Sequence, residues 1–556
     1  MRTGDESVRL DAPSVYQEVD GRRQPVQGAF VLRGPNRAGF TVGSYDRSRE
    51  LIIDPILDFS TYFGGSGDEH STSVAVDGSF NIYLAGSTTS ADLPAATGAF
   101  QGTLNGAQNV YIAKIQPPLG SLVAVLEDLT YLGGDGTDTP VGIKVDGEGN
   151  PFVAGTTNSA NFPTTPTNAY QTTPKSAGTH VFVTKLKFDF GQLVYSSYLS
   201  GDGTDTASGM TIDASGDLYV TGTTTSVEVS TTDQFPATNL PQALPFQVLS
   251  RAPGLAQFFV TKVNTTAPKN ASIAYSTYFG GGTFDTAEPI AVGGGIAVDT
   301  NLNIYFTGTT NFIYSGCTGC SATDFPILNA YQPCLDTAPP TTIVNPASCL
   351  TTTGLTASDA FVAKLDPKAA QGQQLLWSTY VGGTGTDSST GVALDSGATN
   401  VYMIGTTDSS DIATSVNTLN TSAAYQRCLD TPVNPASGTA CTPPAAPAPT
   451  DAFVARLTNP TSTTITLNYF SYLGGTLDDA GLAITVDSNS GAMMTGWTKS
   501  TDFPVFPTSN PIQSALKGTQ DAFLARINTA AVVGQTTIAS CADRRSRSRC
   551  RSENPE

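Results

Sequence analysis

A short motif recurs six times along the chain and constrains its fold more than any other feature. Each copy has a tyrosine, then a bulky apolar residue, then Gly-Gly or, once, Ser-Gly. The six copies begin at Tyr62, Tyr131, Tyr198, Tyr278, Tyr380 and Tyr472. Units of this size are too small to bury an apolar face alone, so they must stack on their neighbours. The chain is therefore predicted to be a repeat protein.

Each copy contains four short runs with strand character. In the first copy they are residues 58–63, 73–76, 81–85 and 109–114, rich in β-branched and aromatic residues and separated by Gly, Asp, Asn, Ser and Pro. No long segment has helical spacing. This pattern predicts an all-β chain in which each repeat forms one blade of a β-propeller, with four antiparallel strands per blade. A linear β-solenoid is the alternative, but its coils are usually shorter and more regular.

The repeated residues resemble a known family. Ser60-Thr-Tyr-Phe-Gly-Gly, Val74-Ala-Val-Asp, Asn81-Ile-Tyr-Leu-Ala-Gly-Ser-Thr, and later Asp-Phe-Pro and Asp359-Ala-Phe-Val-Ala-Lys are similar to the bacterial SBBP repeat, named for a seven-bladed β-propeller. The resemblance extends over residues 58–527. It implies secreted or surface-exposed bacterial proteins, mostly without an assigned biochemical activity.

The resemblance divides the chain into three parts. Residues 1–57 are similar to the end of the β-rich domain that often precedes such repeats, and residues 528–556, with an Arg-rich stretch, are predicted to be a disordered tail. Between them the repeats occupy about 58–116, 128–187, 195–263, 275–365, 377–457 and 470–527. Three readings of the blade number stay open: six blades close the ring, N-terminal strands around 30–53 supply a seventh, or the chain is part of a longer array.

Composition favours an extracellular or cell-surface setting. The formal net charge is −19 while only 13% of residues are charged, so the main body would repel nucleic acid and anionic lipid. No apolar run is long enough to span a bilayer, and the N-terminal residues lack the apolar core of a secretory signal. If the protein is exported, the signal lies upstream of Met1 or the route is unconventional.

Paired cysteines give a separate argument for export. Cys334 and Cys349 in repeat 4 match Cys428 and Cys441 in repeat 5, each pair within a similar loop sequence. Two thiols at equivalent places in a surface loop predict a local disulfide, which persists only in an oxidising compartment. Cys317 and Cys320 are a third candidate pair. A zinc site made by Cys317, Cys320, Cys334 and Cys349 is the alternative.

Acidic residues recur in two series. The first follows each Gly-Gly turn: Glu69, Asp138, Asp205, Asp285, Asp387 and Asp479. The second closes the second strand: Asp77, Asp146, Asp213, Asp299, Asp395 and Asp487. Their presence in every repeat favours a structural role, in which each carboxylate accepts backbone N–H bonds in a turn. Calcium bound by the first series is the functional alternative, because carboxylates and turn carbonyls are hard oxygen ligands; a ligand-binding ring is the third.

Strand order indicates where a partner would bind. In antiparallel blades the loops between strands 1 and 2 and between strands 3 and 4 emerge on one face, which then carries the Gly-Gly turns and the insertions at 311–358 and 408–450. Recognition usually lies on such loops. The sequence therefore predicts a scaffold or binding module for a glycan or protein partner. A secreted hydrolase or lyase acting on polysaccharide, and a purely structural surface array, are the alternatives.

Evidence for an enzyme is weak, and no catalytic residue is assigned. The two histidines, His70 and His180, stand at non-equivalent places, and His180 replaces the aspartate (Asp359, Asp451) that starts the fourth strand in repeats 4 and 5. Nothing resembles a nucleophile elbow. Trp497 replaces a Ser or Thr of the other repeats and is a candidate sugar-stacking residue, with packing as the alternative. No cofactor other than calcium is suggested.

Overall fold

The structure is a computed structural model of the whole chain. It describes residues 2–529 except 4–5, 8–13, 20–21, 33–37, 47–48, 50–51, 55–60, 95–97, 118–122, 228–234, 236–244, 283–289, 313–324, 336–356, 413–423, 432–440, 442–443, 445–447, 460–464, 489, 506–512 and 514. The chain divides into two compact units, Met1–Ser200 with Asn264–Ser272, and Gly201–Val263 with Ile273–Glu556. Each unit is described by itself.

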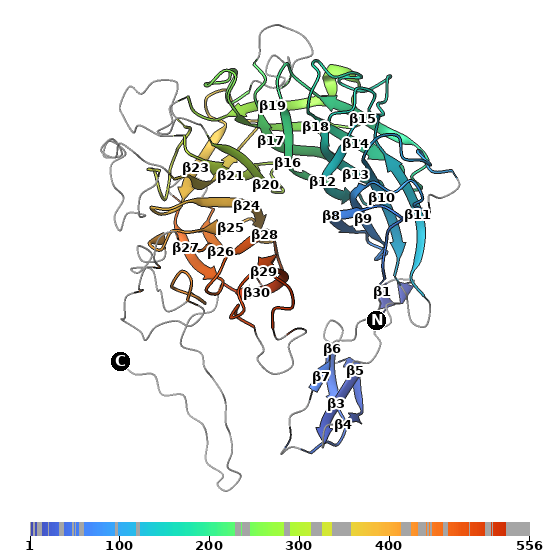
Figure 1. Cartoon of the computed structure of the whole chain (residues 1–556), viewed down its shortest axis with the longest axis vertical. Helices are drawn as coiled ribbons and strands as arrows, with labels where there is room; N and C mark the ends of the chain where they lie inside the picture. Colours follow the sequence, from blue (N-terminus) through green and yellow to red (C-terminus); the bar gives the residue numbers. More distant parts are fainter. Residues whose placement is uncertain are drawn as a thin grey trace. The chain divides into compact units, whose positions relative to one another are not determined.

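The first unit begins with short strands that pair only with one another among the described residues. Three form an antiparallel sheet in the order β4-β3-β7. The other four form two hairpins, β1-β2 and β5-β6 (Figure 1). Their bounds are β1 (Arg2–Thr3), β2 (Glu6–Ser7), β3 (Ser14–Val19), β4 (Arg22–Val26), β5 (Gly28–Leu32), β6 (Ala38–Val42) and β7 (Ile52–Asp54).

The first unit continues with two four-stranded antiparallel sheets. Sheet one consists of β8 (Glu69–Val76), β9 (Ile82–Thr88), β10 (Asn109–Gln116) and β11 (Val125–Leu132). Sheet two consists of β12 (Asp138–Val145), β13 (Pro151–Thr157), β14 (His180–Leu186) and β15 (Leu193–Leu199). Within each sheet the strands lie in chain order, which is the topology of a propeller blade.

The second unit contains four more sheets of the same kind. Sheet three is β16 (Asp205–Ile212), β17 (Asp217–Thr224), β18 (Gln257–Asn264) and β19 (Ile273–Phe279), with the 3-10 helix η1 (Lys269–Ser272) before β19. Sheet four is β20 (Ala291–Val298), β21 (Ile304–Thr310), β22 (Asp359–Leu365) and β23 (Leu375–Val381). Sheet five is β24 (Asp387–Leu394), β25 (Asn400–Thr407), β26 (Asp451–Thr458) and β27 (Leu467–Leu473). Sheet six has only β28 (Asp479–Val486), β29 (Gly491–Thr498) and β30 (Asp521–Asn528).

These sheets make the chain an all-β protein of the β-propeller class, as the sequence predicts. The prediction that one repeat forms one blade is wrong in its boundaries. Each complete sheet takes three strands from one repeat and its fourth strand from the next, so that β11, which ends in Tyr131-Leu132, pairs with β10 of the preceding repeat. The strand that carries each Tyr motif therefore closes the sheet before it.

Cross-strand packing explains two sequence patterns. A glycine on the second strand of each sheet lies opposite an aromatic residue of the third: Gly86 on β9 pairs with Tyr111 on β10, whose ring occupies the space that a Cβ on Gly86 would need. A basic residue three positions after that aromatic residue pairs with an aromatic residue of the second strand, and in sheet two Lys185 Nζ lies 4.6 Å from the centre of the Phe152 ring. Both pairs are units of sheet stabilisation.

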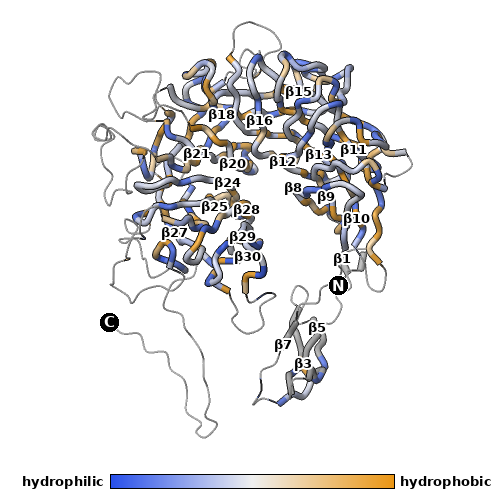
Figure 2. The backbone as a smooth tube through the Cα atoms, in the orientation of Figure 1, coloured by the Kyte–Doolittle hydropathy of each residue, from blue (hydrophilic) through white to orange (hydrophobic). Residues whose placement is uncertain are grey.

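The core of each unit consists of apolar side chains from successive sheets. In the first unit one buried cluster joins residues of sheets one and two, among them Tyr83, Ile112, Val153 and Phe182. Figure 2 shows apolar residues recurring along the strands of the sheets, interrupted by polar positions. Among the described residues, no helix is long and apolar enough to cross a membrane.

Candidate functional site

The first acidic series opens the first strand of each sheet. Asp138, Asp205, Asp387 and Asp479 begin β12, β16, β24 and β28 and are fully buried, whereas Glu69, which begins β8, is partly exposed. Asp285 lies outside the described residues. All five described carboxylates therefore stand at the end of their sheet that also carries the connection between its second and third strands.

Asp138 shows how these carboxylates are held. Its oxygens accept hydrogen bonds from Gly134 N at 2.9 Å, Ser159 Oγ at 3.0 Å and the Thr157 hydroxyl at 2.5 Å. Asp205 accepts the same set from Gly201, Thr224 and Ser226, so the arrangement repeats with the sequence. Through these hydrogen bonds each acid connects the Gly-Gly turn with the start of the loop that follows the second strand of its own sheet.

A second side chain, at the start of the preceding sheet's third strand, faces this acid. In sheet one that residue is Asn109, whose amide Nδ2 donates to Asp138 Oδ2 over 3.1 Å. In sheet five it is Asp451, which accepts hydrogen bonds from Gln426 Nε2 at 2.8 Å and Asp430 N at 3.0 Å. The first glycine of the turn separates the two groups, since a Cβ on Gly474 would collide with both Asp451 and Asp479.

Burial determines the charge state of these carboxyls. It raises the pKa of Asp451 to about 9, with repulsion from Asp430 and Asp479 adding to the effect, and it raises the pKa of Asp387 to about 7. Burial also raises the pKa of Asp138 and of Asp479, although their hydrogen bonds act in the opposite direction. Asp430, next to Asp451, has a pKa raised to about 7 by burial and by the charges of Asp479 and Asp478.

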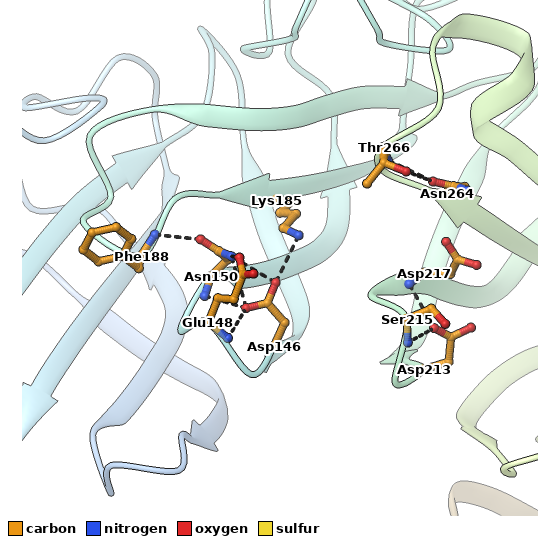
Figure 3. Close-up of polar contacts among 10 residues, drawn as sticks. All are labelled: Asp146, Glu148, Asn150, Lys185, Phe188, Asp213, Ser215, Asp217, Asn264 and Thr266. Atoms are coloured by element: carbon orange, nitrogen blue, oxygen red, sulfur yellow. Dashed lines mark hydrogen bonds and ion pairs between the residues drawn. The ribbon is translucent and has the colours of Figure 1, made fainter.

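The second acidic series lies at the opposite end of the sheets, and lysines pair with its carboxylates (Figure 3). Asp146 Oδ1 accepts hydrogen bonds from Glu148 N at 3.0 Å and Asn150 N at 2.9 Å, and Asp146 Oδ2 lies 3.0 Å from Lys185 Nζ. Asp213 repeats this pattern with Ser215, Asp217 and Lys262. Burial acts to raise the pKa of Asp146 and of Asp213, but the hydrogen bonds and the lysine charge outweigh it and lower both.

The described acids of the first series act as hydrogen-bond acceptors. Asp138 accepts from the N–H groups of Asn109 and Gly134 and from the hydroxyls of Thr157 and Ser159. In the part of the chain that the structure describes, no group of three or more His, Cys, Asp or Glu side chains is arranged to hold a metal ion. Calcium binding by Glu69, Asp138, Asp205, Asp285, Asp387 and Asp479 stays a prediction.

The two histidines have different environments. His70 is exposed on β8, while His180 begins β14 and is buried, at the position that Asp359 and Asp451 occupy in later sheets. His180 Nδ1 lies 2.9 Å from Ser200 Oγ, and Ser200 takes the place of the first glycine of the turn. In the third motif Ser200 thus replaces the first glycine, and the residue that faces it, His180, replaces the aspartate of the later sheets.

The candidate disulfides are only partly within the described residues. Cys428 and Cys441 form a disulfide with their Cα atoms 5.5 Å apart, and Cys334 is also disulfide-bonded. Cys349, Cys317 and Cys320 lie outside the described residues. The Cys428 loop carries Asp430, so the bridge is two residues from the backbone N–H that donates to Asp451.

Trp497 lies on β29 and is partly buried. Lys499 Nζ is 5.3 Å from the centre of its ring, which places a cation over one face of the indole. A sugar ring would have to share or replace this contact. Its role as a stacking residue stays a prediction.

A cavity in the second unit was not foreseen from the sequence. Its volume is about 370 Å³, and its lining includes Lys262, Tyr275, Leu302, Lys368 and Gln374. Lys262 pairs with Asp213, and Leu302 belongs to the turn of Asp299, so the cavity lies at the end of the sheets that carries the second acidic series. The connection at 366–374, which forms one wall, has no counterpart of fixed sequence in the other repeats, and no sequence signal could have located the cavity.

Comparison with known families supports the repeat assignment. The SBBP β-propeller repeat model matches residues 58–94, 129–163, 194–227 and 274–315, and a domain of unknown function, DUF7948, matches residues 1–56. No curated protein matches the chain.

Several solved structures match the chain at very low sequence identity and with low TM-scores. Hydrazine synthase of Kuenenia stuttgartiensis is 8% identical, with 78% of this chain and 94% of that chain covered and a TM-score of 0.30. The Dos1 propeller is 9% identical, with 79% and 68% covered and a TM-score of 0.32. A gluconolactonase of Xanthomonas campestris is 10% identical, with 62% and 73% covered and a TM-score of 0.22. Such low scores carry no argument about function. The repeated motif, the sheets that it builds and the four matched segments show that the chain contains SBBP β-propeller repeats.

Proposed function

We propose that the protein is an extracellular binding scaffold that recognises a glycan or protein partner through the long connections at the end of the sheets where the first acidic series lies. The observation that supports this proposal is an asymmetry between the two ends. At one end β21 and β22 are joined by residues 311–358 and β25 and β26 by residues 408–450, whereas at the other end β12 and β13 are joined by a turn at 146–150.

The long connections start from rigid anchors. The Thr-x-Ser segment after β25 is fixed by Ser409, whose hydroxyl donates to Asp387 Oδ2 at 2.8 Å and whose carbonyl accepts from the Tyr472 hydroxyl at 2.7 Å. Variable loops on a fixed base are the usual site of recognition in repeat scaffolds. The disulfide between Cys428 and Cys441 shortens the free part of one such loop and favours an oxidising compartment.

The experiment compares loop exchange at the two ends. Residues 313–356 and 413–447 are each replaced by the shorter connection of sheet two, residues 160–177, and binding is measured on a glycan array and on bacterial cell surfaces. Loss of binding by at least tenfold is expected. The matched control exchanges the turn 146–150 for the turn 213–217, which should leave binding unchanged. If the loop exchange leaves all binding of the intact chain in place, the proposal is wrong.

A further inference from the structure

One contact in the second unit joins an amine side chain to an amide side chain. Lys364, on β22, donates from Nζ to Oδ1 of Asn459 over 3.1 Å. Asn459 directly follows β26, so the contact links sheet four to the connection between β26 and β27 in sheet five. An amine and a primary amide can condense to a secondary amide with release of ammonia, so the surroundings of this pair determine its chemistry.

Lys364 has no countercharge, unlike the lysines at its position in the earlier sheets. Those lysines each form an ion pair with a carboxylate: Lys114, Lys185 and Lys262. Among the described residues no carboxylate lies within ion-pair distance of Lys364, which is only 5% exposed and has its Nζ 5.1 Å from the centre of the Tyr305 ring. Burial lowers the pKa of Lys364, against the charges of Asp299 and Asp366. A desolvated lysine is the better nucleophile, because more of it is the neutral amine.

Asn459 is held in place by its own hydrogen bonds. Its backbone N–H donates to the Thr399 carbonyl at 2.9 Å. Its side-chain Nδ2 donates to the Ala398 carbonyl and to the Tyr305 hydroxyl, the latter at 2.7 Å. Residue 460 is proline, which has no backbone N–H, so Asn459 cannot lose ammonia by cyclising onto the next residue.

The amide oxygen of Asn459 receives a second donor. Trp377, on β23, donates from Nε1 to the same Oδ1 over 3.2 Å and is 1% exposed. Lys364 pairs with Trp377 on one side and with Tyr305 on the other, so all three residues lie in one row across sheet four. A buried N–H on a carbonyl oxygen stabilises the negative charge that develops there when a nucleophile adds to the carbon.

We propose that Lys364 and Asn459 form an intramolecular isopeptide bond. The Lys364 amine adds to Cγ of Asn459, Trp377 Nε1–H stabilises the charge on Oδ1, and the bond from Cγ to Nδ2 breaks. One proton passes from Nζ to Nδ2, which leaves as ammonia, so the products are one secondary amide and one ammonia molecule. The Tyr305 hydroxyl, 2.7 Å from Nδ2, is placed to carry that proton. Holding the two groups together in one buried site supplies the proximity that the reaction needs.

The bond closes a covalent loop that contains the long connection at 408–450. Cross-linking a loop of this length restricts the unfolded chain and so stabilises the folded one. The disulfide between Cys428 and Cys441 lies within the same loop but is lost under reducing conditions, whereas an amide persists. The isopeptide bond therefore fixes sheet four to sheet five in any redox compartment.

The test is the intact mass of the purified full chain, measured under denaturing and reducing conditions. A mass below that of the sequence by one ammonia molecule is expected. Trypsin should then release a branched peptide that contains both Lys364 and Asn459, because trypsin does not cleave after a lysine in amide linkage. A chain that keeps its full sequence mass and yields an unmodified peptide ending at Lys364 would overturn the proposal.

Matched substitutions locate the bond. Lys364→Arg keeps the positive charge but removes the amine, and Asn459→Ser removes the amide, so both should abolish the loss of ammonia. Lys262→Arg, at the corresponding position in sheet three, should retain it in full. Trp377→Phe should slow bond formation on the order of a hundredfold through loss of the donor to Oδ1. The proposal fails if ammonia is still lost in Lys364→Arg, or if Lys262→Arg abolishes the loss while its circular dichroism shows native sheet content.

Discussion

The two ends of the sheets carry the same residue type in opposite electrostatic states. At the end with the long connections, the pKa of Asp451 is raised to about 9 and that of Asp387 to about 7, because burial dominates. At the other end the pKa of Asp146 and that of Asp213 are lowered, because backbone N–H groups and a lysine outweigh burial. Periodic aspartates in one chain thus serve two different physical purposes.

Glu69 sharpens this comparison. It makes the same hydrogen bonds as the buried acids, from Ser90, Thr88 and Gly65 N, but it is partly exposed. Burial acts to raise its pKa, but the hydrogen bonds from Ser90, Thr88 and Gly65 together outweigh burial, and its pKa is lowered. Within the first series the hydrogen bonds are shared, so the direction of the pKa shift depends on how deeply each carboxyl is buried.

The largest effect is expected from Asn109→Asp. Asn109 donates to Asp138 Oδ2, and a carboxylate there would create a second buried acid pair and lose that donor. Folding should weaken by about 3 kcal/mol at pH 8, measured by urea denaturation and by hydrogen exchange in β10 and β12. An unchanged exchange rate at pH 8 would show that the facing amide does not control the state of Asp138.

The converse change, Asp451→Asn, should stabilise the protein. It removes one of two facing carboxyls and supplies an amide donor toward Asp479, as Asn109 does for Asp138. A gain of about 2 kcal/mol is expected at pH 8, read from the same two measurements in β26 and β28. Asp68→Asn, at an exposed aspartate, is the control for a general loss of negative charge, and a similar gain there would argue against a local effect.

The dependence of stability on pH should distinguish the two ends. Because the folded pKa of Asp451 and that of Asp387 lie above the ordinary value of 3.8, their contribution to stability is complete below about pH 4 and is lost as pH rises through 7 to 9. Asp146 and Asp213 have lowered values, so their contribution is present above about pH 4 and is lost below it. The urea concentration at the unfolding midpoint, measured from pH 3 to 9.5, should fall toward both extremes of pH. Asp451→Asn should reduce only the fall toward alkaline pH.

The smallest effect is expected from Asp146→Asn. The amide oxygen can still accept from Glu148 N and Asn150 N, but the ion pair with Lys185 is lost, at a cost of about 1 kcal/mol. Asp77→Asn is the matched control, since in that sheet Lys114 pairs with Glu127 at 2.8 Å instead. A loss for Asp77→Asn as large as for Asp146→Asn would assign the effect to the turn rather than to the ion pair.

Much of the fold could be predicted from the sequence because its signals are local. Strand runs, turn residues and the sixfold Tyr motif determine the sheets, and the Gly86–Tyr111 pair shows that even the aromatic spacing has a local steric cause. The sheet to which each outer strand belongs could not be predicted. The sequence of such a strand is equally compatible with pairing to its own repeat and with pairing to the preceding repeat. Only the pairing of β10 with β11 decides it.

The candidate site was predicted less completely than the fold. The position of the first acidic series in the Gly-Gly turns is visible from spacing alone, but the side chain that faces each acid comes from the preceding repeat, so Asn109 and Asp451 could be recognised as partners only in three dimensions. A sequence clue exists in retrospect: the first glycine of the motif is replaced only where His180 replaces the facing Asp.

Each complete sheet takes its outer strand from the next repeat. This has a consequence for how such arrays can gain repeats and where they can be truncated. An internal duplication of any whole repeat adds one donated strand and one accepting edge, so copy number can change without redesign of any single unit. The same rule governs dissection of this chain. A fragment that ends after β10 exposes an unpaired edge, whereas one that ends after Leu132 keeps sheet one whole.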